Sequence, residues 1–208
     1  MWVKICGIKR LKDALAAAEA GADAIGFVFA PSRHQINPQE VRKISLVLPS
    51  TVAKVGVFVN ESLRTVKEKA DFCRLDYLQF HGNESQQYCS KFQRKIIKAF
   101  SVRDCKTILN PGDYSVYLRL FDIHSQKNPE GTDQGFNCVK LIDKIRKLGP
   151  FVLAGGLTPE NVLQNIKRFR PYGVDVSSGV ETAGEKDIDK IRNFIRIAKR
   201  EARYHVTR

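Results

Sequence analysis

A short apolar segment followed by a helical pattern recurs eight times along this chain of 208 residues. The apolar segments are too short for helices and are bounded by turn signals, so each is interpreted as a buried strand. In sequence order the predicted strands are Val3–Cys6, Ala24–Phe29, Lys54–Val59, Asp76–Phe80, Lys95–Phe100, Val116–Phe121, Phe151–Ala154 and Gly173–Val176.

Four of the helical patterns give further detail. Leu11, Ala14, Leu15 and Ala18 share one face of the first, and Asn37 and Pro38 begin the second. Ile142 starts the apolar face of the helix before the seventh strand, and Thr158 and Pro159 begin the helix after that strand.

Strands that alternate with helices pair in parallel, because each helix carries the chain back to the start of the next strand. Eight such units close into a (β/α)8 barrel, here a compact one with short loops. An open doubly wound sheet is the alternative, but it usually has fewer strands and a GxGxxG motif, which this sequence lacks. No linker or change in composition divides the chain, so residues 1–208 are predicted to form a single barrel domain.

Composition narrows the class of protein. With 43% hydrophobic and 27% charged residues the chain is predicted to be globular. No apolar run reaches the roughly 18–20 residues of a membrane span, and the N-terminus enters a strand at once, so neither a membrane partner nor a signal peptide is expected. The five cysteines have no CxxC spacing and indicate thiols in a reducing, cytoplasmic compartment. Four of them, Cys73, Cys89, Cys105 and Cys138, are interpreted as packing residues.

The formal net charge of +13 raises the question of a nucleic-acid partner. Much of this charge lies on helical patterns. In the last one, residues Ile188, Ile191, Ile195, Ala198 and Ala202 form an apolar stripe that places the lysines and arginines on the outer face. Without a recognised binding motif, nucleic acid is not the expected partner. A basic surface also concentrates small anionic substrates.

Reactive residues collect at the predicted strand ends, where (β/α)8 barrels carry their chemistry. Gly155-Gly156 and Ser177-Ser178-Gly179 follow the last two strands, where backbone N–H groups often bind phosphate, although glycines there can also serve only tight turns. Cys6 and Asp122 end the first and sixth strands and could pass a proton across a bound sugar as base and acid. The alternative for a lone thiol is simple packing.

Six motifs, in order along the whole chain, resemble the phosphoribosylanthranilate isomerases of tryptophan biosynthesis. They are KICGI (4–8), EAGADAIGFVF (19–29), VGVFVN (55–60), QFHG (79–82), AGGLTPENV (154–162) and DVSSGVE (175–181). The resemblance implies a cytoplasmic (β/α)8 barrel that needs no cofactor and no metal. Its partner would be a small molecule, N-(5'-phosphoribosyl)anthranilate, which an Amadori rearrangement converts to the aminodeoxyribulose phosphate. Monomer and homodimer both stay open.

The resemblance also implies roles for individual residues. Cys6 corresponds to the general base and Asp122 to the general acid, which requires a thiol with a lowered pKa and a carboxyl group that holds a proton. The phosphate cradle corresponds to Gly155, Gly156, Ser178 and Gly179, with Asp175 close by, and Gln79 and His81 match polar positions of the pocket.

Three departures from the family pattern fall in substrate-binding loops. His34 occupies the place of an arginine that meets the anthranilate carboxylate, so His34 and its neighbour Arg33 are both candidates for that contact. The stretch 130–134 reads EGTDQ where GGTG is usual, and Asn137-Cys138 replaces Asp-Trp. These changes leave open a related phosphoribosyl-amine isomerase with an altered substrate, or a catalytically silent barrel that binds phosphorylated metabolites, a partner protein or RNA. The retained Cys6 and Asp122 favour the isomerase.

Overall fold

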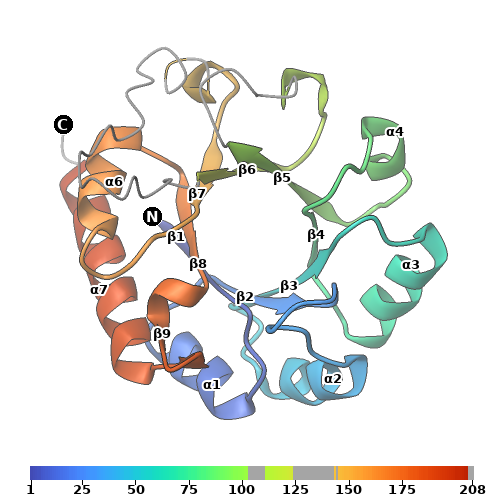
Figure 1. The fold of residues 1–208 in the computed structure, drawn as a ribbon, viewed down its shortest axis with the longest axis horizontal. Helices are drawn as coiled ribbons and strands as arrows, with labels where there is room; N and C mark the ends of the chain where they lie inside the picture. The colour runs from blue at the N-terminus through green and yellow to red at the C-terminus, as the bar shows by residue number, and fades with distance from the viewer. Residues whose placement is uncertain (103–110, 124–142, 144, 206–208) are drawn as a thin grey trace.

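The chain folds into a closed barrel of eight parallel strands surrounded by helices (Figure 1). The computed structural model describes residues 1–102, 111–123, 143 and 145–205. The barrel strands are β1 (Trp2–Cys6), β2 (Ala24–Val28), β3 (Ala53–Phe58), β4 (Tyr77–Phe80), β5 (Lys95–Val102), β6 (Leu118–Ile123), β7 (Phe151–Ala154) and β8 (Gly173–Val176). The eight predicted strands and the barrel are therefore confirmed, and no strand boundary differs from its prediction by more than two residues.

Helices cover the outside of the barrel. They are α1 (Leu11–Glu19), α2 (Pro38–Val47), α3 (Leu63–Phe72), α4 (Gln86–Cys89), α6 (Val162–Phe169) and α7 (Ile188–His205). The predicted start of α2 is confirmed, since the Asn37 side chain accepts a hydrogen bond from the Glu40 N–H at 2.9 Å and Pro38 opens the helix. Among the described residues, no helix combines the length and apolar composition of a membrane span.

Two local predictions were wrong. Thr158 and Pro159 do not begin a helix, because a turn precedes α6, in which the Asn161 side chain accepts a hydrogen bond from the Thr158 N–H at 2.8 Å. Leu11 does not lie on the buried face of α1 but is exposed. The buried position there is Asp13, whose carboxylate pairs with Arg10 at 2.6 Å and so enters the core without an unpaired charge.

The apolar core has two parts. The larger cluster combines residues from strands and helices and therefore lies between the barrel wall and the outer helices. The smaller cluster contains residues of strands alone and fills the barrel interior. Its buried members are Ala24, Val55, Ile97, Ala99, Leu118, Leu120, Val152 and Ala154. This inner cluster closes the barrel beneath the loops that follow the strands.

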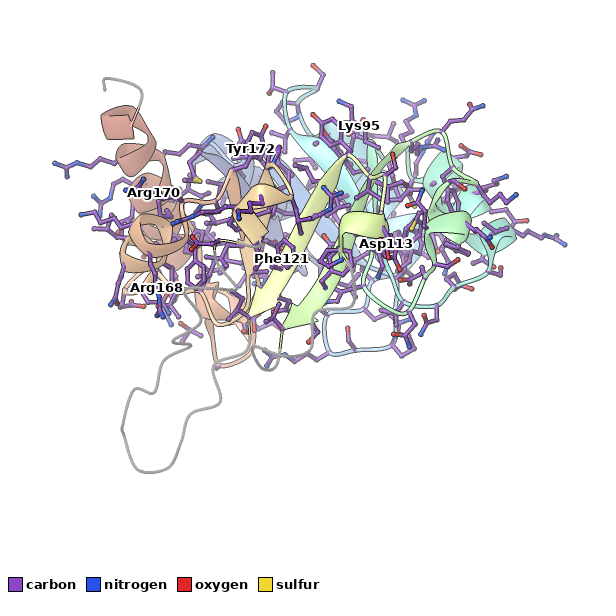
Figure 2. All side chains as sticks on the ribbon, turned by 90° about the horizontal axis from the view of Figure 1, so that it is seen from above. Lys95, Asp113, Phe121, Arg168, Arg170 and Tyr172 are labelled. Carbon is purple, nitrogen blue, oxygen red and sulfur yellow. The ribbon has the colours of Figure 1, made fainter. Side chains whose placement is uncertain are left out.

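The starts of the strands share one end of the barrel, which leaves the other end for the strand-to-helix loops. Lys95 and Tyr172 lie at the starts of β5 and β8 and appear on the same side of the molecule (Figure 2). At the loop end, after β8, the short helix η2 (Ser178–Val180) leads into a hairpin of β9 (Glu181–Thr182) and β10 (Glu185–Lys186) that was not predicted.

Several predictions fall on residues outside the described part of the chain. They are the departures at 130–134 and at Asn137-Cys138, the packing role of Cys105, and the start of the helical pattern near Ile142. The side chain of Ala202 is likewise outside it. Cys73 and Cys89, by contrast, are buried free thiols, as predicted for packing residues.

Candidate active site

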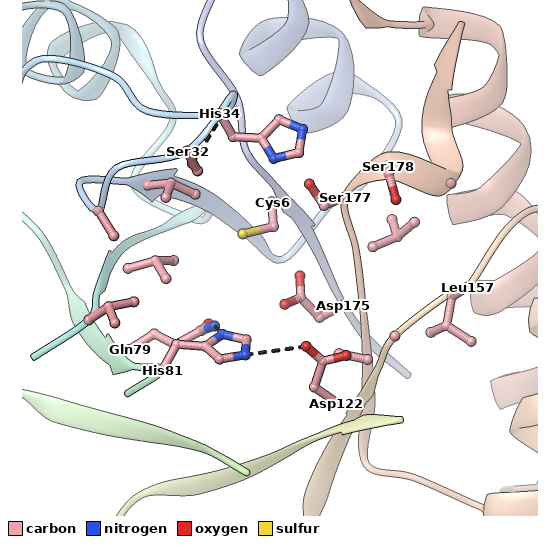
Figure 3. A pocket seen from close by; sticks show the side chains of 18 of the residues that line it. Cys6, Ser32, His34, Gln79, His81, Asp122, Leu157, Asp175, Ser177 and Ser178 are labelled. Atoms are coloured by element: carbon pink, nitrogen blue, oxygen red, sulfur yellow. Dashed lines mark hydrogen bonds and ion pairs between the residues drawn. The ribbon is translucent and has the colours of Figure 1, made fainter. Parts of the chain in front are cut away.

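A cavity of about 340 Å³ opens at the loop end of the barrel. Its wall includes residues near the ends of seven of the eight strands or in the loops that follow them: Cys6, Val28, Ala30, Pro31, Ser32, His34, Val57, Val59, Gln79, His81, Asp122, Ala154, Gly155, Gly156, Leu157, Asp175, Val176, Ser177, Ser178 and Gly179. Cys6 and Asp122 face it from different sides (Figure 3). Every candidate named from the sequence therefore lines this one cavity, with the exception of Arg33.

The cavity wall changes character from one side to the other. Near the ends of β2 and β3 it is apolar, with Val28, Val57 and Val59 beside Ala30 and Pro31. Across from this, the turns after β7 and β8 supply small residues and backbone, namely Gly155, Gly156, Ser177, Ser178 and Gly179. One side is therefore suited to a flat apolar group and the other to an anion held by backbone N–H groups.

Two positions in these turns must be glycine because neighbouring backbone atoms lie too close to admit a side chain. Gly155 has φ +93°, and a Cβ there would overlap the Ile123 carbonyl oxygen and lie 2.6 Å from Asp122 Oδ1. A Cβ on Gly179 would overlap the carbonyl group of Leu157. Both turns can thus pack against their neighbours only because a side chain is absent.

Asp122 is held by a short chain of polar side chains from β4. His81 Nε2 lies 3.2 Å from Asp122 Oδ2, and the Gln79 amide nitrogen lies 3.3 Å from His81 Nδ1 (Figure 3). With the amide oriented in this way, Gln79 donates to Nδ1, so Nε2 carries the proton and donates to the carboxylate. Gln79 is buried, and it fixes the imidazole that in turn fixes Asp122.

Cys6 lies at the end of β1 and is only 8% exposed. Burial raises the pKa of its thiol above the ordinary value, and the nearby Lys4 ammonium opposes this shift without cancelling it. The lowered thiol pKa implied by the family resemblance is therefore not found in the ligand-free protein. A thiolate here depends on positive charge close to the sulfur.

At the mouth of the cavity, His34 lies in the wall while Arg33 points outward. Both contact the same carboxylate, with His34 Nε2 2.8 Å from Glu181 Oε1 and Arg33 Nη2 3.1 Å from Glu181 Oε2. Burial lowers the pKa of His34 below its ordinary value, against the opposing effect of Glu181. Although burial opposes it, Lys186, at 2.7 Å, together with His34 holds the pKa of Glu181 below its usual range. The Arg33 side chain is 60% exposed.

Three charged residues of the site were missed from the sequence. Glu181 and Lys186 face each other across the β9–β10 hairpin, and Lys186 also donates to the Ser177 carbonyl at 2.9 Å. Lys4 lies inside the barrel, its ammonium 2.8 Å from Asp175 Oδ2. A signal for Lys4 existed, because it lies two residues before Cys6 in a strand and so shares its face.

No group of three or more His, Cys, Asp or Glu side chains in the described ranges is arranged to hold a metal ion. The chemistry that these residues can offer is proton transfer between a thiol and a carboxyl group on different sides of a bound molecule.

Comparisons with known proteins show the family. The family model for N-(5'-phosphoribosyl)anthranilate (PRA) isomerase matches residues 3–197. An N-(5'-phosphoribosyl)anthranilate isomerase from Desulforudis audaxviator is 49% identical over 199 residues, which cover 95% of this chain and 97% of the relative.

Solved structures of such isomerases have the same fold. One, in complex with reduced 1-(o-carboxyphenylamino)-1-deoxyribulose 5-phosphate, is 40% identical with a TM-score of 0.85, and the match covers 96% of this chain and 98% of that one. Another, of monomers generated from the dimeric Thermotoga maritima enzyme, is 40% identical with a TM-score of 0.84 and the same coverage.

Proposed function

Because the chain belongs to the N-(5'-phosphoribosyl)anthranilate isomerase family, we propose that Cys6 and Asp122 carry out the isomerisation in the cavity described above. Family membership makes the protein an aldose–ketose isomerase of tryptophan biosynthesis. The observation that carries the proposal for the two residues is their placement on different sides of a single cavity that also has an apolar wall and two small-residue turns.

The substrate fits this cavity in one orientation. The sugar phosphate lies against the turns that contain Gly155, Gly156, Ser178 and Gly179, where backbone N–H groups bind its oxygens. The anthranilate ring then lies against the valines that end β2 and β3, and its carboxylate lies near His34. The ribose is left between Cys6 and Asp122, with Asp175 and Gln79 beside it as hydrogen-bonding partners.

The reaction follows from that placement. Asp122, positioned by His81, gives a proton to the ring oxygen as the bond from this oxygen to C1' breaks, and an iminium ion forms. The Cys6 thiolate then takes the proton from C2', and the electron pair of the C–H bond forms the double bond of an enolamine. Tautomerisation of the enolamine gives the ketone. These steps leave Cys6 as a thiol and Asp122 as a carboxylate, so before the next turnover the thiol must lose a proton and Asp122 must take one up.

We also form expectations for the cellular compartment and the oligomeric state of the protein. A base that works as a thiolate is suited to the reducing cytoplasm, where we expect the enzyme to act. We expect the protein to be either a monomer or a homodimer.

The proposal is tested by the loss of substrate fluorescence on adding purified protein, with Cys6→Ser and Asp122→Asn run alongside. We expect each variant to lose about 10²- to 10⁴-fold in kcat, the usual contribution of a positioned acid or base. Cys73→Ser, a change at another buried thiol, and Asp189→Asn, at a 95% exposed carboxylate, are matched controls that should keep parental activity. Parental turnover in Cys6→Ser or Asp122→Asn would refute the assigned roles.

A further inference from the structure

Lys4 is a charged residue in the interior of the barrel. Its side chain is 0% exposed, and it neighbours Ala24 of β2, a member of the inner apolar cluster. Its ammonium lies 2.8 Å from Oδ2 of Asp175. A buried ammonium is costly unless it is paired, so a lysine at this position needs an explanation beyond filling space.

Lys4 also lies close to the sulfur of Cys6. Both side chains point from β1 into the barrel, where Gly26 of β2 lies beneath them: a Cβ on Gly26 would be 2.7 Å from Cys6 Sγ and 2.9 Å from Lys4 Cε. The Lys4 ammonium hydrogen-bonds Asp175, and it lies close enough to the Cys6 thiol to oppose the rise that burial causes in the thiol pKa. The missing side chain at Gly26 thus allows the lysine and the thiol to meet.

Only one of the two oxygens of the Asp175 carboxylate, the one that pairs with Lys4, has a hydrogen-bond partner in the described part of the chain. Asp175 lines the cavity, and its second oxygen, Oδ1, is buried with no hydrogen-bond partner among the described residues. A buried acceptor without a partner is costly, and a ligand hydroxyl that donates to it would remove the cost. The sugar is the part of the substrate that carries hydroxyl groups.

We propose that Lys4 is the positioning residue that favours ionisation of Cys6, and that a substrate hydroxyl bound to Asp175 Oδ1 strengthens this effect by drawing carboxylate charge away from Lys4. The inference rests on the proposed function of Cys6 as the base. In this proposal the Lys4 ammonium interacts with two anions, the Asp175 carboxylate and the Cys6 thiolate. A ligand that hydrogen-bonds Asp175 weakens the attraction between Asp175 and Lys4, so Lys4 stabilises the thiolate more strongly.

The charges around the thiol support this assignment. Besides burial, Lys4 is the strongest influence on the pKa of Cys6 and lowers it, Asp175 raises it, and the more distant Lys186 lowers it. The other titratable groups of the cavity wall are His34, His81 and Asp122. Burial alone would lower the pKa of Lys4, but Asp175 and Cys6 more than offset this, so the lysine is charged at neutral pH.

The test measures the ionisation of Cys6 directly. Iodoacetamide alkylation is followed across pH by mass spectrometry of the peptide that contains Cys6, in the parent, in Lys4→Met and in Asp175→Asn. We expect the alkylation rate at pH 7 to fall about tenfold or more in Lys4→Met, the effect of one unit of thiol pKa, and to rise in Asp175→Asn. Opposite effects on one thiol would not follow from general loosening of the barrel.

Two further variants keep the test decisive. Lys4→Met/Asp175→Asn removes both charges and protects folding, and we still expect a thiol less ionised than in the parent. Lys43→Met removes a lysine whose side chain is 71% exposed on α2, and it should leave Cys6 alkylation unchanged. A double variant that alkylates at the parental rate across pH would overturn the inference. Because alkylation needs no turnover, that result is separate from a failure of the isomerase assay.

Discussion

Two buried lysines of the barrel each pair with a carboxylate, and the two pairs differ in how many of their polar atoms have hydrogen-bond partners. Lys98 on β5 lies 3.2 Å from Glu84 Oε2 and also donates to the carbonyl groups of Phe80, Gly82 and Ala99. Both oxygens of the Glu84 carboxylate also have partners, because they accept hydrogen bonds from the N–H groups of Asn60 and Gly82. Lys4 is paired with Asp175, but one oxygen of that carboxylate has no hydrogen-bond partner in the described chain, and Asp175 lines a cavity.

The difference indicates which pair serves the fold and which serves the reaction. Lys98 and Glu84 join the loops that follow β3 and β4, and every strong hydrogen-bonding atom of the pair already has a partner. Such a closed network offers nothing to a ligand. The pair of Lys4 and Asp175 is open on one side, so a ligand can complete it, and a change in it reaches the thiol of Cys6.

The largest effect is expected where the closed pair is broken. Lys98→Met leaves Glu84 buried and charged without its partner, and breaking a buried pair in this way typically costs about 3–5 kcal/mol of unfolding free energy. Urea unfolding measures that loss. Adding Glu84→Gln removes the unpaired charge and should recover part of the lost unfolding free energy. A Lys98→Met protein as stable as the parent would show that this pair is not structural.

A smaller effect on stability is expected from alanine at the two adjacent glycines after β7, of which one is surrounded by neighbouring atoms and the other is not. An alanine Cβ at Gly155 would lie against Asp122 and the Ile123 backbone, whereas at Gly156, φ +60°, it would meet nothing within 4 Å. Gly156→Ala should therefore cost only backbone strain, about 1 kcal/mol. Gly155→Ala should cost about 1–3 kcal/mol and also lower kcat, because Asp122 must move. Equal stabilities and equal kcat values for the two variants would contradict this difference.

Much of this architecture could be predicted from the sequence, because its signals are local. Eight apolar segments separated by helical patterns specify a barrel, and strand ends such as Cys6 and Asp122 then meet at one rim. Partners that are distant in sequence could not be predicted. Asp13 is buried because Arg10 pairs with it, and Lys4 is buried because Asp175, on the last strand, closes the barrel beside it.

The hairpin that carries Glu181 and Lys186 was missed for a similar reason. Its turn is the pair Ala183-Gly184, both with positive φ, and alanine gives no signal for that conformation. The motif DVSSGVE contains Glu181, but the sequence does not reveal that His34, Arg33 and Lys186 all converge on it. Electrostatic clusters assembled from loops after different strands are visible only in three dimensions.

The smallest effect concerns the mouth of the cavity, where Glu181 already holds His34. Burial keeps the pKa of His34 below its ordinary value of about 6.5, so at pH 8 its ring is neutral. Its Nε2 proton is directed to Glu181, which leaves Nδ1 as an acceptor that cannot bind a carboxylate. Protonation at lower pH turns Nδ1 into a donor, so KM should rise as pH increases from 5.5 to 8.

His34→Arg supplies a permanent charge and should lower KM at pH 8 by roughly threefold to tenfold, the effect of about 1 kcal/mol or slightly more from one added charged hydrogen bond. The gain should shrink toward pH 5.5, where His34 itself becomes charged. Arg33→Gln is the matched control, since this mostly exposed side chain lies outside the cavity wall and should change KM little. Steady-state assays at both pH values decide the point. If Arg33→Gln raises KM more than His34→Arg lowers it, the carboxylate is read by Arg33, and the site extends beyond the cavity to the outer side of Glu181.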